Sequence, residues 1–167
     1  AGLRNLCMIH LMLDAGFRLG DVVSLTFKGI NFNLNYLVVK GKGDKFRTVF
    51  LCSKLKRMLY HYLLKFRSYT PGDDYPVFVQ VGTTEPITET SVHMVFARLK
   101  KRSGIDRLHP HLLRHTFATR AIECGMNPKT LQKLLGHGTL QMTMDLYCHV
   151  TEDTLFLEME KFEKRCS

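Results

Sequence analysis

The sequence contains no apolar run long enough to span a membrane, and no stretch has the pattern of a secretory signal peptide. We therefore expect a protein without a membrane partner. The chain also starts at Ala1, without a methionine, and enters a helical pattern at once. We expect it to be a domain of a longer protein.

A paired-cysteine pattern is absent as well. The five cysteines are odd in number and scattered, and none of them forms a C-x-x-C pair. They are Cys7, Cys52, Cys124, Cys148 and Cys166. This distribution predicts reduced thiols in a cytosolic protein and argues against a disulfide framework or a structural zinc site.

Acidic residues are scarce. The chain has 15 Asp and Glu against 24 Lys and Arg, which gives a formal net charge of +9. Residues 152–167 carry five acids against three bases, so the rest of the chain carries +11. This excess of basic residues predicts a polyanionic partner, usually nucleic acid. Charge alone leaves open an enzyme that is basic incidentally.

The hydrophobic pattern predicts one mainly helical domain of the α+β class, with a small antiparallel three-stranded sheet. A chain of 167 residues with 45% hydrophobic content can bury a sizeable core. Strands are expected within 30–51, around a turn at 41–44, and at 77–79. Helices are expected at 3–14, 20–25, 53–67 with Ser53 as N-cap, 88–104, 110–124, 128–135, 140–148 and 152–164.

One segment in the last third of the sequence concentrates residues that can attack a phosphodiester without a metal. His111 and Arg114 stand three positions apart, on one face of a helix that Pro110 can begin. The start of that helix offers backbone N–H groups and a positive dipole end to a phosphate. His137 follows in a Gly-His-Gly turn, and Tyr147 comes ten residues later. The arginine and the histidines can hold a phosphate and move protons, and the tyrosine can be the nucleophile.

Two basic elements upstream belong with this segment. Arg18 lies in a helix–turn–helix junction close to glycines. Lys42 lies between two glycines at the tip of the predicted hairpin, from which an amine can reach a DNA groove or a leaving group. Lys40, Lys45 and Arg47 surround this tip, and we expect them to bind DNA.

In these residues the chain resembles the catalytic domain of the tyrosine recombinase, or phage integrase, family. The family pattern has an Arg, a Lys, a His-x-x-Arg, a Gly-His and a Tyr, in that order. Here the elements are Gly16-Phe17-Arg18, Gly41-Lys42-Gly43, His111-Leu112-Leu113-Arg114, Gly136-His137 and Met142-Thr143-Met144-Asp145-Leu146-Tyr147. The resemblance covers nearly the whole chain and looks closest to integrases of bacterial mobile elements. One departure is Asp21, where the family more often has Glu; either acid can orient Arg18.

The resemblance implies site-specific cleavage and rejoining of DNA for the integration or excision of a mobile element. Tyr147 would attack a phosphodiester, leaving a 3′-phosphotyrosine and a free 5′-hydroxyl. Arg18 and Arg114 would clamp the non-bridging oxygens, where the charge of the transition state develops.

Three further residues would handle protons and hydrogen bonds. Lys42 would protonate the leaving 5′-oxygen, unless Lys40 or Lys45 takes that role. His111 would assist proton transfer with Tyr147, and His137 would hydrogen-bond the scissile phosphate. The phosphotyrosine bond would conserve the energy of the cleaved phosphodiester, so the resemblance implies no cofactor. The sequence likewise has no P-loop and no cluster of acids for a two-metal site.

Other interpretations of these residues are weaker. His109, His111 and His115 have the spacing of metal ligands, but no Cys or Glu joins them and Arg114 would repel a cation. A type IB topoisomerase shares the chemistry, although its pattern usually lacks a Gly-His such as Gly136-His137. A non-catalytic DNA-binding module would not need the complete catalytic set.

The resemblance also implies partners and organisation. Double-stranded DNA would be the substrate, bound by a homo-tetramer on synapsed DNA that is monomeric when free, in a bacterial cytoplasm at the nucleoid. We expect 1–150 to be the catalytic domain and 151–167 an amphipathic helix, which packs on its own domain or is exchanged between protomers. The apolar stripe of that helix is Leu155, Phe156, Met159 and Phe162. Relatives usually carry an N-terminal domain that completes a clamp around DNA.

Overall fold

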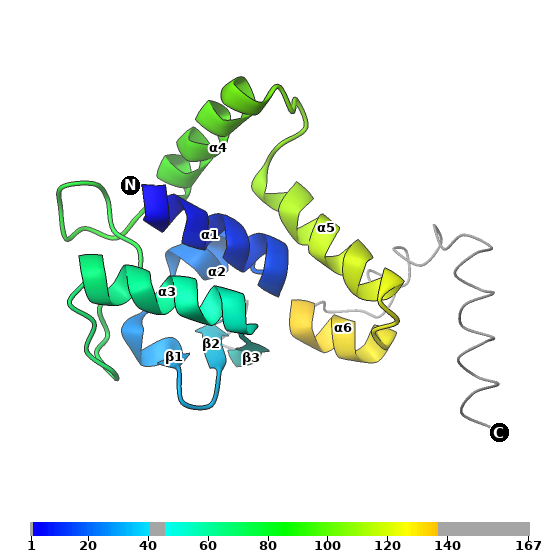
Figure 1. The fold of residues 1–167 in the computed structure, drawn as a ribbon, viewed down its shortest axis with the longest axis horizontal. Coiled ribbons are helices and arrows are strands. Elements are labelled where there is room, and N and C mark those ends of the chain that lie inside the picture. Colours follow the sequence, from blue (N-terminus) through cyan, green and yellow to red (C-terminus); the bar gives the residue numbers. More distant parts are fainter. Residues whose placement is uncertain (1, 41–45, 137–167) are drawn as a thin grey trace. The chain divides into compact units, whose positions relative to one another are not determined.

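The computed structural model describes residues 2–40 and 46–136, which form helices and a small sheet (Figure 1). In chain order the elements are α1 (Gly2–Ala15), α2 (Leu19–Val23), the 3₁₀ turn η1 (Phe27–Gly29), β1 (Ile30–Asn31), β2 (Tyr36–Lys40), β3 (Phe46–Phe50), α3 (Ser53–Phe66), α4 (Glu89–Ser103), α5 (Pro110–Glu123) and α6 (Pro128–Leu135). This confirms the predicted mainly helical α+β class. The predicted turn at 41–44 and the predicted helices at 140–148 and 152–164 lie outside the described residues.

The chain divides into two compact units, Ala1–Phe117 and Ala118–Ser167, and α5 crosses the boundary. The first unit contains the sheet and the main hydrophobic core, in which α1 and α3 pack side by side (Figure 1). In the second unit, α6 buries Leu131 and Leu135. No helix among residues 2–40 and 46–136 has the length and apolarity needed to cross a membrane.

The end of α1 determines where Arg18 lies. The helix buries an apolar face that contains Met8, Leu11 and Met12. Gly16 then takes a left-handed conformation with φ of +66°, which ends the helix. The N–H of Phe17 donates to the carbonyl of Leu11 at 3.1 Å. Arg18 follows with extended backbone as the residue that precedes α2.

The three-stranded sheet places alternate residues of β3 on opposite faces. The strand order is β1-β2-β3 and both pairs are antiparallel, with Val39 opposite Arg47 and Leu37 opposite Val49. Leu37, Val39 and Val49 are buried. Because side chains alternate along a strand, Arg47 shares the inward face with Val49. Phe46 lies on the other face and is exposed.

The structure confirms most of the predicted helix ends and corrects one. Thr88 caps α4 by accepting from the N–H of Ser91 at 3.1 Å. Asn127 caps α6, whose bounds are the predicted 128–135. The prediction that Ser53 is an N-cap was wrong: Cys52 holds the cap position, and its side chain makes no capping hydrogen bond.

The predicted strand at 77–79 was also wrong. Only isolated bridges occur here, between Thr26 and Pro76 and between Val79 and Pro86. The carbonyl of Val77 accepts from the Arg67 Nε at 3.2 Å, and that of Val79 accepts from the Arg4 Nη1 at 2.6 Å. Arginine side chains thus satisfy carbonyls that a strand partner would otherwise pair.

Candidate active site

Arg114 lies on the first turns of α5 and reaches the junction between α1 and α2. Its Nη1 donates to the carbonyl of Gly16, 98 residues earlier in the sequence. Gly16 is two residues before Arg18, and Arg18 lies close enough to act electrostatically on Arg114. The structure therefore brings together the two arginines that the sequence assigned to the phosphate clamp.

This arginine site is strongly positive, with Arg114 buried and Arg18 half-buried. Arg114 is only 7% exposed. Burial, with the charges of Arg18 and Arg47, lowers the pKa of Arg114 to about 9, and Asp21 opposes the shift. Burial and the charge of Arg47 also lower the pKa of Arg18. A positive charge that has lost its water gains most from an anion placed beside it.

Asp21 is the carboxylate at the centre of the site. It is 4% exposed and lies in the first turn of α2. Its Oδ2 accepts from the backbone N–H of Arg18 at 2.7 Å and from the Nη2 of Arg47 at 2.5 Å. Its Oδ1 accepts from the Arg47 Nη1 at 3.4 Å. Asp21 therefore holds the backbone of Arg18 and pairs with the guanidinium of Arg47.

Arg47 lies inside this site, and its side chain is only 10% exposed. Its guanidinium carbon lies 5.8 Å from the centre of the Phe17 ring, a cation–π contact. Its Nε is buried and has no hydrogen-bond partner among the described residues. The sequence predicted that Arg47 binds DNA and missed the pair with Asp21. Val49 shares a face of β3 with Arg47, but the sequence does not show that this face is the buried one, because the opposite face carries the hydrophobic Phe46 and Phe50, which are exposed.

His111 lies at the start of α5, where the sequence placed it. Pro110 is the first residue of the helix, and the Nδ1 of His109 accepts from the N–H of Leu112 at 3.3 Å. His111 is exposed, with its ring 6.4 Å from that of His109. Within 2–40 and 46–136, no three His, Cys, Asp or Glu residues form a group that could hold a metal ion.

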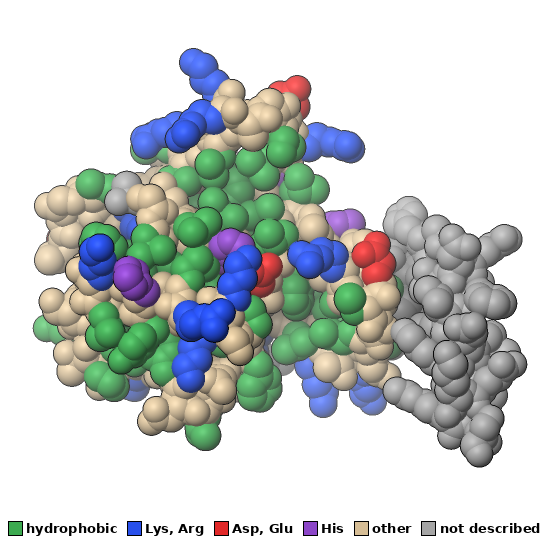
Figure 2. All heavy atoms as spheres, viewed as in Figure 1, with side chains coloured by type: hydrophobic (Ala, Val, Ile, Leu, Met, Phe, Trp, Pro, Cys, Tyr) green, Lys and Arg blue, Asp and Glu red, His purple; other side chains and the backbone are tan. Residues whose placement is uncertain are grey.

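Of the other predicted site residues, the structure describes only Lys40. Lys40 ends β2, opposite Phe46, and is exposed. Lys42, Lys45, His137 and Tyr147 lie outside the described residues. Figure 2 shows further Lys and Arg side chains projecting from the end of α4, where Lys100, Lys101 and Arg102 form the last turn.

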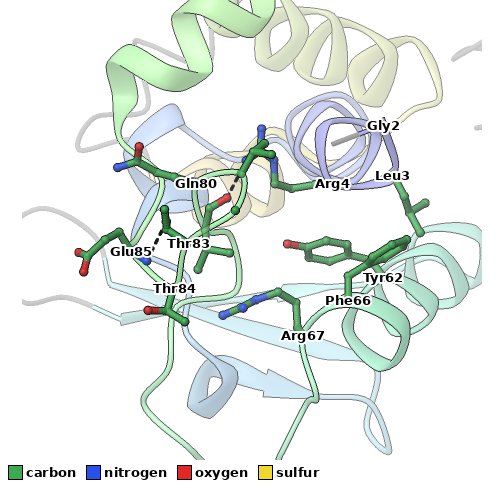
Figure 3. A pocket seen from close by; sticks show the side chains of 13 residues that line it. Gly2, Leu3, Arg4, Tyr62, Phe66, Arg67, Gln80, Thr83, Thr84 and Glu85 are labelled. Atoms are coloured by element: carbon green, nitrogen blue, oxygen red, sulfur yellow. Dashed lines mark hydrogen bonds between the residues drawn. The ribbon is translucent and has the colours of Figure 1, made fainter.

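A separate cavity of about 720 Å³ lies between the start of α1, the end of α3 and the loop at 79–85. It is lined by none of the predicted catalytic residues. Figure 3 shows Arg4 and Arg67 projecting from its wall. Arg4 donates to the carbonyl of Val79, the first residue of the loop, at 2.6 Å, and Arg67 donates to the carbonyl of Pro76, just before the loop, at 2.8 Å. These arginines therefore hold the segment 76–79, which leads into the loop, against α1 and α3.

Comparison with known proteins identifies the family and the fold of this chain. Residues 1–154 match the model of the phage integrase family. The tyrosine recombinase XerC of Bacillus pumilus is 35% identical over 161 residues, which cover 92% of this chain and 52% of that protein. XerC of Chlamydia caviae is 32% identical, over 90% of this chain and 48% of its own length. The chain thus spans about half the length of the curated relatives that it matches.

Solved structures share the fold. The crystal structure of XerA recombinase has a TM-score of 0.78 and 26% identity, covering 96% of this chain and 58% of that one. The Tn1549 transposon integrase in complex with transposon right end DNA has a TM-score of 0.75 and 26% identity, covering 93% and 57%. The chain belongs to the phage integrase family and has the fold of a tyrosine recombinase catalytic domain.

Proposed function

We propose that this chain is the catalytic domain of a site-specific recombinase that cuts and rejoins DNA through a 3′-phosphotyrosine intermediate. The observation that carries the proposal is that the buried Arg114 and the half-buried Arg18, which occupy the two arginine positions of the family motif, lie close together. Among the described residues of this site, three guanidinium groups face one carboxylate, that of Asp21. A phosphodiester is an anion that planar guanidinium groups bind strongly through charge-assisted hydrogen bonds.

The chemistry begins with attack by the Tyr147 oxygen on the scissile phosphorus. The bond to the 5′-oxygen breaks, and Lys42 delivers a proton to that oxygen as it leaves. Arg18 and Arg114 stabilise the charge on the non-bridging oxygens. His111 takes part in the proton transfer of the tyrosine. A 5′-hydroxyl of a second strand then attacks the phosphotyrosine and restores a DNA backbone.

The substrate is double-stranded DNA, and the biological reaction is the integration or excision of a mobile element. The named relatives support this assignment: they include XerC recombinases and a transposon integrase bound to transposon DNA. The net charge of +11 over residues 1–151 suits a DNA partner. The active assembly is a homo-tetramer on two synapsed duplexes, and the free protein is a monomer located at the bacterial nucleoid.

A nicked suicide substrate tests the reaction. Duplexes with nicks at successive positions, tiled across the ends of the element that carries the coding sequence, are incubated with the protein and run on a denaturing gel. A covalent adduct is expected, because the short 5′-hydroxyl fragment diffuses away before rejoining. Binding without an adduct at any nick would instead identify a non-catalytic module. Exchange of strands between duplexes separates a recombinase from a topoisomerase, which only relaxes supercoils.

Removal of residues 152–167 is expected to weaken synapsis. If the apolar stripe of this segment docks on a neighbouring protomer, the truncated protein should form fewer paired complexes in a gel-shift assay. Covalent cleavage by single subunits should persist. Unchanged synapsis would mean that the segment packs on its own domain.

A further inference from the structure

Arg47 contacts the segment that carries Arg18 on both sides of that arginine. Before Arg18, its guanidinium lies over the ring of Phe17, 5.8 Å from the centroid. After Arg18, it forms two hydrogen bonds with the carboxylate of Asp21, at 2.5 and 3.4 Å. A residue on β3 thus holds a junction between two helices that lie far from it in the sequence.

The buried carboxylate of Asp21 depends on its contact with the guanidinium of Arg47. Its side chain is 5% exposed, and an ionised carboxylate buried to that degree is costly without a charged partner. Arg47 supplies that partner with two donors in fork geometry. The same carboxylate oxygen that binds Arg47 Nη2 also accepts from the backbone N–H of Arg18. Displacing Asp21 would therefore displace Arg18.

The junction also positions Arg114. The carbonyl of Gly16, directly before Phe17, accepts from the Arg114 Nη1. Arg18 and Arg114 are thus anchored to one segment, 16–21, and Arg47 holds this segment from the side of the sheet. The side chain of Arg47 is 10% exposed and both of its Nη atoms donate to Asp21, so these two donors are already committed within the protein.

We propose that Arg47 is a positioning residue, which acts through Asp21 and Phe17 to hold Arg18 and Arg114 in the geometry that grips the scissile phosphate. This inference rests on the proposed function, because it assigns a task within that reaction. It differs from a direct contact between Arg47 and DNA, which the sequence pattern alone had suggested.

The test compares Arg47→Gln, Arg47→Lys and Asp21→Asn with the wild type on the suicide substrate. Three quantities are measured: the single-turnover rate of adduct formation at saturating protein, the Kd for DNA with its salt dependence, and the Tm. Arg47→Gln is expected to lower the saturated rate roughly 10- to 100-fold, because small displacements of a catalytic group have effects of this size. The Kd and its salt slope should stay close to wild type. Arg47→Lys should restore part of the rate.

Lys40→Gln is the contrasting variant, because Lys40 is exposed on the adjacent strand. Loss of a phosphate contact should weaken its binding and reduce the salt slope by about 1. The same behaviour in Arg47→Gln, with an unchanged saturated rate, would overturn the inference in favour of a direct DNA contact. A lowered Tm with a wild-type rate for the folded protein would overturn it in favour of a purely structural role.

A double-mutant cycle tests whether Arg47 acts through Asp21. The combination of Asp21→Asn with Arg47→Gln should lose no more activity than the worse single variant, because both remove one interaction. Fully additive losses would contradict the proposed route.

If Arg47→Gln does not fold, Arg47→Lys serves alone in the rate measurement. A wild type that forms no adduct would overturn the proposed function itself, whereas an active wild type with fully active Arg47 variants would overturn only this inference.

Discussion

Replacing Arg114 with alanine is expected to lower the rate of adduct formation by on the order of 10²–10³-fold, the usual cost of removing one preorganised donor to transition-state charge. Arg114 is buried beside Arg18 and cannot be replaced there by a mobile surface cation. Arg114→Lys keeps the charge but loses the planar fork, so its rate should fall between those of the wild type and Arg114→Ala. Single-turnover kinetics on the suicide substrate measure all three rates.

The same substitution removes the donor to the Gly16 carbonyl, so stability must be measured alongside. Loss of one buried partner costs about 1–3 kcal/mol, and rates should be compared well below the Tm of the variant. Arg107→Ala is the matched control, because Arg107 is an exposed arginine shortly before α5. It should keep the wild-type rate. A folded Arg114→Ala protein that cleaves as fast as this control would remove Arg114 from the phosphate site.

Tyr147→Phe is expected to abolish the covalent adduct while leaving DNA binding intact. The change removes a single oxygen atom, which is the atom proposed to bond to phosphorus. No other group in the proposed mechanism can replace it, so the loss should be complete rather than partial. Denaturing gels measure the adduct, and a gel-shift titration under native conditions measures the binding.

Tyr75→Phe provides the comparison. Tyr75 is 64% exposed, and its ring packs edge-on against Phe27, a contact that phenylalanine preserves. This variant should form adduct at the wild-type rate. An adduct that persists in Tyr147→Phe at the level of Tyr75→Phe would move the nucleophile to another residue.

Local sequence patterns were sufficient to predict most of the fold. The Asn127-Pro128 start and the Gly136 end of α6 are local signals, and the structure has them in those roles. The short apolar run at 77–79 predicted a strand, and Val77 and Phe78 are buried although no strand forms. The hydrophobic pattern does not reveal which groups form hydrogen bonds with the backbone N–H and carbonyl groups of this segment. Here the partners include Arg4 and Arg67, which come from elements far away in the sequence.

The candidate site was predictable in its parts but not in its connections. The spacing from His111 to Arg114 and the glycine before Arg18 are local features. The pair of Asp21 and Arg47 is a contact between a helix start and a strand, and no local spacing encodes it. The alternation of β3 indicates only that Arg47 shares a face with Val49, not that this face is buried. The sequence therefore predicted a role for Asp21 near Arg18 without identifying the guanidinium that holds it.

The most direct test of the central claim is to locate the covalent bond itself. The adduct formed on the suicide substrate is digested with nuclease and trypsin, and the modified peptide is sequenced by mass spectrometry. The tryptic peptide of residues 134–161 contains Tyr147 as its sole tyrosine, since the other five tyrosines lie at or before position 75. A 3′-nucleotide on Tyr147 is the predicted result. A nucleotide on any other residue, or on none, would contradict the account.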